Sequence, residues 1–141
     1  MAEENAAALE EFLDGWDPKA DIDAWKRGTL RDFSLLDPEM AYEDTVLPDH
    51  AGETYRGLEG LFRATERWLE PFKVLTVKLE RIVGTGDCLV SIQRAHGVAE
   101  HTGIEFDQSY AYIWTFRDGK VVHLISYMNP ADALEAAGLS E

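Results

Sequence analysis

The chain has 141 residues, the length of one ordinary domain, so we expect residues 1–141 to form a single domain and exclude two full ones. Thirteen lysines and arginines against 27 aspartates and glutamates give a net charge of −14, which repels nucleic-acid phosphates and anionic membranes. A content of 45% hydrophobic and 11% aromatic residues excludes an intrinsically disordered chain.

The N-terminal segment is typical of a cytoplasmic protein, and the single cysteine is expected to be a free thiol. Residues 1–11 carry acids and alanines where a signal peptide needs basic residues followed by an apolar run. No later apolar stretch is long enough to span a bilayer. Cys88 has no partner for an intrachain disulfide, and the apolar neighbours Leu89 and Val90 predict that it is a buried thiol.

Helical periodicity dominates the first half of the chain. Apolar residues recur at helical spacing from Leu9 to Trp16, and Gly15 and Pro18 mark the end of this first helix. The elements predicted next are a helix from an Asp21 cap to Gly28, a helix over Thr29–Leu36, a strand over Met40–Val46, a loop over Leu47–Arg56 and a helix over Leu58–Leu69.

From Phe72 onward the hydrophobic period changes to two, which is typical of strands. The predicted strands are Phe72–Val83, Asp87–His96, Ile104–Arg117 and Lys120–Met128. The hairpin dipeptide Asp118-Gly119 favours an antiparallel meander. Asn129-Pro130 then predicts the cap and first residue of a terminal helix that ends at Gly138.

This order of elements predicts an α+β fold with the helices on one face of a strongly bent antiparallel sheet. Alternation along Ile104–Arg117 indicates which face is covered, because one side carries most of the aromatic residues. That side contains Phe106, Gln108, Tyr110, Tyr112, Trp114 and Phe116. Its glutamine and two phenols must find hydrogen-bond partners or a ligand when they are buried.

Three short motifs in this order of elements resemble the SnoaL-like group of the nuclear transport factor 2 superfamily. They are Tyr42-Glu43-Asp44, Tyr55-Arg56-Gly57 and the stretch Tyr112–Val122 around Asp118-Gly119. The resemblance implies a conical, cystatin-like roll whose curved antiparallel sheet wraps the N-terminal helices around an internal pocket, usually in a homodimer. Ketosteroid isomerase, limonene epoxide hydrolase, scytalone dehydratase and polyketide cyclases share this fold, so the resemblance is specific for the fold and weak for the reaction.

The resemblance also implies site residues, position by position. Asp44 matches the general base that ketosteroid isomerase carries at the end of its first strand. Tyr112 stands where that family and the polyketide cyclases carry a catalytic acid, so a hydrogen-bond donor is kept but a carboxylic acid is not. Phe12 and Trp16 cannot replace the phenol of the first helix of ketosteroid isomerase. Ser126 stands where limonene epoxide hydrolase needs a carboxylate, which argues against that reaction.

Further side chains are expected to complete the pocket. His96 is predicted to reach its mouth as a third catalytic residue, while Tyr110, Gln108 and Ser126 would form a polar wall. The aromatic residues that could line an apolar cavity are Trp16, Trp25, Tyr42, Trp68, Trp114 and Phe116. The alternatives are ordinary core packing for the aromatic residues and a strand-end cap or salt bridge for Asp44.

Other chemistries find no support in the sequence. The four histidines have no metal-binding spacing, there is no Cys/His cluster, and neither a phosphate-binding glycine loop nor a Gly-x-Ser-x-Gly motif is present. We therefore predict no metal site and no cofactor. Residues 48–52, which include His50, form a candidate lid.

The leading hypothesis is an enzyme that moves protons on a hydrophobic, carbonyl-containing small molecule, in an isomerisation, cyclisation or dehydration. Asp44 would abstract the proton while Tyr112, with Tyr110 or His96, stabilises the oxyanion. One alternative is a non-catalytic module that binds a hydrophobic ligand in the same pocket. Another is a homodimer whose main role is structural. For any dimer, the expected interface is the convex sheet face, with Ser109, Ala111, Ile113, Ile125 and Tyr127.

Overall fold

The computed structural model describes residues 2–44, 53–70, 72–84 and 86–139. Its centre is a six-stranded sheet with the strand order β2-β1-β6-β5-β4-β3. The strands are β1 (Leu36–Asp44), β2 (Glu53–Arg56), β3 (Phe72–Val83), β4 (Cys88–Ala99), β5 (Glu105–Arg117) and β6 (Lys120–Tyr127). The helices are α1 (Ala2–Asp14), α2 (Pro18–Arg27), α3 (Gly57–Leu69) and α4 (Pro130–Ala136).

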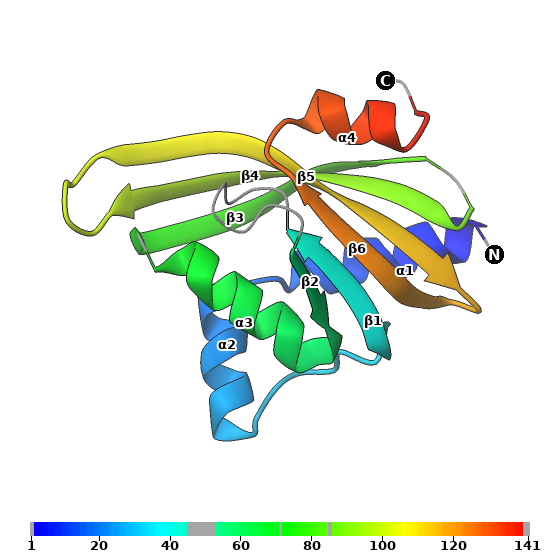
Figure 1. The fold of residues 1–141 in the computed structure, drawn as a ribbon, viewed down its shortest axis with the longest axis horizontal. Helices are drawn as coiled ribbons and strands as arrows, with labels where there is room; N and C mark the ends of the chain where they lie inside the picture. Colours follow the sequence, from blue (N-terminus) through cyan, green and yellow to red (C-terminus); the bar gives the residue numbers. More distant parts are fainter. Residues whose placement is uncertain (1, 45–52, 71, 85, 140–141) are drawn as a thin grey trace.

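The sheet curves strongly, and α1, α2 and α3 lie on its concave side (Figure 1). Neighbouring strands are antiparallel except for β1 and β6, which run parallel one strand in from the β2 edge of the sheet. The predicted α+β roll with a curved sheet around the N-terminal helices is therefore confirmed, with one parallel pair that the sequence did not indicate.

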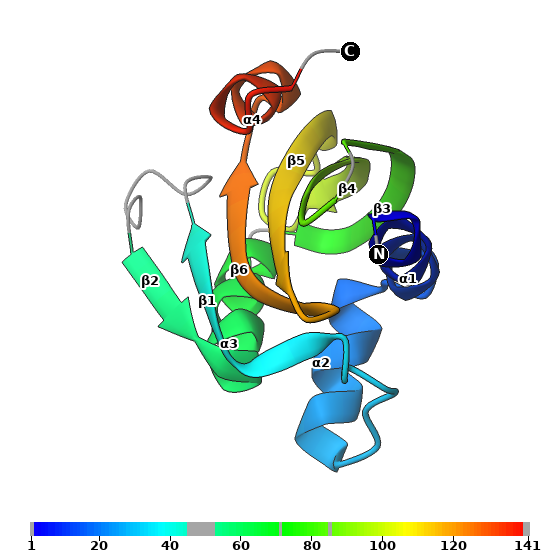
Figure 2. The same ribbon diagram turned by 90° about the vertical axis from the view of Figure 1, so that its right-hand side faces the viewer.

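The structure corrects the prediction that all helices share one face. Turned by 90°, the molecule shows α4 on the side of the sheet away from α1, α2 and α3 (Figure 2). Ala133 and Leu134 of α4 pack there against an outer cluster of strand residues that includes Val90, Ile92, Ala111 and Ile113. Ile125 and Tyr127 pack against the same cluster. The apolar part of the face predicted for a dimer interface is thus covered by α4 of the same chain.

Helix ends follow local capping chemistry. The side chain of Asp17, not that of Asp21, caps α2 by accepting a hydrogen bond from the backbone N–H of Ala20 at 3.1 Å. Pro18 is the first residue of α2, and Gly28 ends it with a φ of 75°, a left-handed conformation that favours glycine. Asn129 caps α4 in the same way through the N–H of Ala131.

Two segments differ from the predicted elements. Residues 29–35 form no helix, because Asp32 accepts a hydrogen bond from the N–H of Ser34 at 2.8 Å, a local turn that competes with helix formation. The first strand begins at Leu36 instead of Met40. Residues 53–56, predicted as the end of a loop, pair with β1 as a strand. The rest of that loop, with the candidate lid over residues 48–52, lies outside the described residues.

Candidate functional site

A small enclosed cavity lies between the concave face of the sheet and the helices. Its lining residues are Trp16, Pro18, Tyr42, Thr65, Trp68, Tyr110, Tyr112 and Ser126. The space available to the centre of a water-sized sphere is about 10 Å³, which is room for about one water molecule. All of these side chains are neutral, so the described wall is aromatic with several hydroxyl groups.

Strand alternation brings the phenols together. Tyr110 and Tyr112 lie on one face of β5, and Tyr112 pairs across the sheet with Ser126 of β6. The ring centres of Tyr110 and Tyr112 are 5.4 Å apart, and that of Tyr42 lies 6.4 Å from that of Tyr112. Trp68 of α3 closes the other side, with its ring centre 5.3 Å from that of Tyr110.

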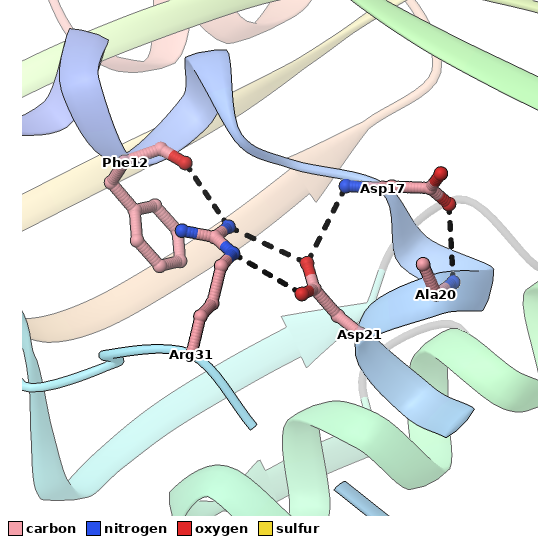
Figure 3. Close-up of polar contacts among 5 residues, drawn as sticks. All are labelled: Phe12, Asp17, Ala20, Asp21 and Arg31. Atoms are coloured by element: carbon pink, nitrogen blue, oxygen red, sulfur yellow. Dashed lines mark hydrogen bonds and ion pairs between the residues drawn. The ribbon is translucent and has the colours of Figure 1, made fainter. Parts of the chain in front are cut away.

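An ion-pair cluster ties the end of α1 and the start of α2 to Arg31, which follows α2 (Figure 3). The guanidinium of Arg31 donates to the carboxylate of Asp21 at 3.2 Å and to the carbonyl oxygen of Phe12 at 3.1 Å. The same carboxylate accepts a long hydrogen bond from the backbone N–H of Asp17 at 3.4 Å. Because these contacts hold Phe12 and Asp17, on either side of Trp16 in the sequence, they restrict the position of Trp16 in the cavity wall.

Several polar atoms around the cavity are buried without hydrogen-bond partners among the described residues. They are Nε1 of Trp16, Oη of Tyr110 and both amide atoms of Gln93. Gln93 does not line the cavity, but it pairs directly with Tyr110 across β4 and β5 and is only 1% exposed. Unpartnered buried polar groups destabilise a fold, so a water molecule or a ligand in the cavity is the partner that they require.

Burial also controls the ionisation of Tyr110. It raises the pKa of the phenol well above its usual value of 10.0. The neighbouring hydroxyls of Tyr112 and Tyr42 raise this pKa further, and the amide of Gln93 lowers it in part. Tyr110 therefore keeps its proton at physiological pH and is available as a hydrogen-bond donor.

Besides Trp68, the structure brings five of the predicted site residues to the lining of this cavity. The five are Trp16, Tyr42, Tyr110, Tyr112 and Ser126. Trp114 lines an adjoining space with Phe12, Leu13, Trp16, Leu61, Tyr112 and Leu124. Gln108 is half-buried on the cavity side of β5 but is not among the lining residues.

Asp44 is described by its backbone only. It is the last residue of β1, two positions after Tyr42, and pairs with Glu53 of β2 and Ser126 of β6. Both Tyr42 and Ser126 line the cavity, so the strand position of Asp44 is next to it. The Asp44 side chain lies outside the described part of the structure, and its role stays a prediction.

His96 does not reach the cavity. It is exposed on β4, on the strand face that carries Val90 and Ile92, and that face is turned toward α4. The charges near it are those of Arg94 and Asp107, which form an ion pair at 2.7 Å on the outer surface. The prediction that His96 points into the pocket assigned the wrong face of β4 to the interior.

Reasoning from sequence missed Gln93, Thr65 and Pro18. Gln93 shares the concave face of β4 with Ser91 and Ala95, and the polar pattern of these positions is typical of an exposed face. The register of β4 against β5 would have identified it, because it places Gln93 opposite Tyr110. Thr65 and Pro18 carry no signal beyond their helix positions.

Metal and membrane sites find no structural support in the described part of the chain. No group of three or more His, Cys, Asp or Glu side chains there could hold a metal ion. Nor does any helix among these residues have the length and apolar character needed to cross a membrane.

Comparison with known proteins gives a family and a set of related folds. The profile of the SnoaL-like domain matches residues 9–124. A protein described as a SnoaL-like polyketide cyclase from Jannaschia sp. CCS1 superposes with a TM-score of 0.67 at 19% identity, covering 99% of this chain and 95% of that one. Bal32a, from a soil-derived mobile gene cassette, gives a TM-score of 0.63 at 18% identity and covers 96% of each chain.

A third solved structure was determined with a small molecule present. TerC, co-crystallised with polyporic acid, gives a TM-score of 0.57 at 16% identity, covering 86% of this chain and 99% of that one. At these identities the likeness shows the fold alone. No curated protein matches the chain significantly.

Proposed function

The chain belongs to the SnoaL-like domain family, and from that premise we propose that it is an enzyme that moves protons on a hydrophobic, carbonyl-containing small molecule. The observation that carries the proposal is the neutral cavity in which Tyr110, Tyr112 and Ser126 lie beside the strand position of Asp44. Such a wall supplies hydrogen-bond donors for a carbonyl oxygen next to a carboxylate that can accept a proton.

The proposed reaction begins at Asp44. Its carboxylate takes a proton from a carbon next to the carbonyl, and the electrons of that C–H bond move into the carbonyl to give an enolate. The hydroxyls of Tyr112 and Tyr110 donate to the enolate oxygen. Protonated Asp44 then returns the proton to another carbon of the conjugated system, which completes an isomerisation. In cyclisation the enolate carbon would instead attack a second carbonyl carbon of the same molecule, whose C=O electrons move onto its oxygen, and protonated Asp44 would give its proton to that alkoxide.

The ionisation of Tyr110 supports its role as a donor. Because burial raises the pKa of its phenol, the group stays protonated while negative charge develops on the substrate oxygen. A general base contributes roughly 10²–10⁴-fold to such a step when it is well placed. No cofactor takes part in this scheme.

The aromatic wall fits a flat or cyclic substrate. Tyr42, Trp16 and Ser126 would contact it, with the ring of Trp68 on the opposite side. Since the described cavity holds about one water molecule, a substrate must displace part of this wall on entry. Trp114 and Gln108 would influence the shape of the cavity from neighbouring positions. A homodimer formed through the outer face of the sheet would include α4 in its interface.

Proton exchange at a model ketone tests the proposal without knowledge of the natural substrate. 2-Tetralone in D₂O should lose its α-proton NMR signals faster with the wild-type protein than without it. Asp44→Asn should lower the catalysed rate about 10²–10⁴-fold. Tyr112→Phe should lower it about 10²-fold, as expected for removal of an oxyanion donor.

The same assay separates the enzyme from a binding module. Full exchange activity in Asp44→Asn would rule out this residue as the base. Binding of 2-tetralone without any catalysed exchange would instead favour the alternative, a non-catalytic module that binds hydrophobic ligands.

A further inference from the structure

Gln93 is a buried amide whose polar atoms have no hydrogen-bond partner among the described residues. It lies on the concave face of β4, opposite Tyr110 of β5, and the two residues are 1% and 3% exposed. The hydroxyl of Tyr110 is also unpartnered in this part of the chain. Two complementary polar groups are therefore adjacent in register and close enough to interact, yet neither has a well-formed hydrogen bond in the described structure.

A neighbouring pair on the same two strands shows the opposite behaviour. Ser91 is two residues before Gln93 on the same face and is fully buried. Its hydroxyl oxygen accepts a hydrogen bond from Nε1 of Trp114 at 2.7 Å. Strands β4 and β5 can therefore bring buried polar side chains into hydrogen-bond contact. The unpaired state of Gln93 and Tyr110 on the same strands needs a separate explanation.

The two residues differ in their access to the cavity. Tyr110 lines it, whereas Gln93, opposite Tyr110 on the neighbouring strand, is not among the lining residues. The amide of Gln93 can accept from a phenol O–H or donate to a phenol oxygen. When the O–H of Tyr110 points into the cavity, the phenol oxygen still has a free lone pair. The amide N–H of Gln93 can donate to that lone pair.

We propose that Gln93 is a positioning residue that holds the Tyr110 hydroxyl as a donor toward a neutral acceptor oxygen, such as a carbonyl, of a ligand in the cavity. The acceptor is taken to be neutral because the described lining has no charged side chain that could pair with an ionised group. Successive hydrogen bonds from amide to phenol to ligand strengthen one another in a low-dielectric interior. The inference rests on the proposed function for the donor role of Tyr110, but it requires binding only and no turnover.

Two probes of nearly equal shape test this role. Acetophenone carries a carbonyl oxygen where α-methylstyrene carries a CH₂ group, so the ratio of their affinities, measured by NMR titration, reports the hydrogen bond to that oxygen. Gln93→Met should lower the preference for acetophenone by about five- to tenfold, the size expected for loss of one hydrogen bond. Tyr110→Phe should cause a similar loss.

A double-mutant cycle separates positioning from direct contact. If Gln93 acts through Tyr110, Gln93→Met should have no further effect on the preference in the Tyr110→Phe background. An undiminished effect there would overturn the proposal, because Gln93 would then act without Tyr110.

Thermal stability provides a second readout with a matched control. Gln93→Met removes buried unpaired polar atoms and should raise the Tm by about 2–4 °C. Ser91→Ala removes a paired group and should lower the Tm while keeping the wild-type preference for acetophenone. An unchanged probe preference in Gln93→Met, or failure of the wild-type protein to bind either probe, would overturn the proposal.

The exchange assay keeps this inference distinct from the proposed function. Loss of the acetophenone preference in Gln93→Met, together with Asp44-independent exchange, would remove the proton-transfer proposal and keep this one. Asp44-dependent exchange with an unchanged preference in Gln93→Met would keep the proton-transfer proposal and remove the positioning role of Gln93.

Discussion

Two groups of polar side chains near Trp16 differ in how they are satisfied. On the helix side, Arg31 and Asp21 pair with each other and with the backbone of Phe12 and Asp17 (Figure 3). On the sheet side, the hydroxyl of Tyr110 and the amide of Gln93 have no partner within the described structure.

The difference separates a part of the fold that gives stability from a part that is available to a ligand. Arg31 also packs its guanidinium over the rings of Phe12 and Phe33, each 4.8 Å from the ring centre, so these rings add to the stabilisation of its charge. The hydroxyl of Tyr110 and the amide of Gln93 gain no comparable stabilisation from the described part of the chain. Their best partners would come from a bound molecule, which is the arrangement expected of a site that gives up stability for function.

Removal of Arg31 should produce the largest loss of stability in this comparison. Arg31→Met leaves the carboxylate of Asp21, whose side chain is 8% exposed, without its main partner. Since the Arg31 side chain is itself 32% exposed, we expect a loss of about 3 kcal/mol in the free energy of unfolding, at the lower end for a broken buried pair. Urea unfolding measures it.

Arg94→Met is the matched control, because Arg94 forms its ion pair with Asp107 on the exposed outer surface. Its urea midpoint should stay close to that of the wild type. Equal losses in the two variants would show that the Arg31 pair has no special structural role.

Loss of the hydrogen bond between Ser91 and Trp114 should be smaller. Ser91→Ala leaves the indole N–H of Trp114, a side chain that is 3% exposed, without the acceptor at 2.7 Å. The expected decrease is about 1–3 kcal/mol, the cost of one unpaired buried donor. Chemical unfolding should show a lower free energy of unfolding for Ser91→Ala and a higher one for Gln93→Met. Changes of the same sign in both variants would contradict the distinction between the two pairs.

Alkaline pH should reveal the burial of Tyr110. Its pKa in the folded protein is raised above the usual value of 10.0, so the folded state retains a proton that the unfolded state loses. The associated stability is fully present below about pH 10 and is lost as the pH rises toward the folded pKa, by at most about 1.4 kcal/mol per pH unit. Tyr110→Phe should show a shallower decline in unfolding free energy above pH 10, and parallel curves would contradict the assignment.

The sequence predicts strands well where one face is apolar and the other polar. The alternation along β5 identified the side that carries Tyr110 and Tyr112, and the structure places these residues on the concave face. It failed for β4, because Val90 and Ile92 are buried under α4 while Ser91 and Gln93 are buried on the concave face. A strand buried on both sides loses the alternation that would assign its faces.

Tertiary placement explains the other differences. Asn129 and Pro130 predicted the start of α4, but capping chemistry does not determine which face of a sheet a helix covers. The aromatic cavity followed from the resemblance and the pattern of β5. The unpaired state of Gln93 depends on strand register and on the absence of a neighbouring partner in the described structure, and neither is visible in the sequence.

His96→Ala should have the smallest effect, and it tests the assignment of the two faces of β4. His96 is exposed on the outer face, so its replacement removes no group from the cavity and leaves no buried atom without a partner. Exchange of 2-tetralone and the preference for acetophenone should both equal those of the wild type, whereas Tyr112→Phe on the concave face should reduce exchange about 10²-fold. A comparable loss in His96→Ala would mean that the outer face, between α4 and the Arg94–Asp107 pair, takes part in the reaction. The catalytic site would then have to be sought there and not among the phenols.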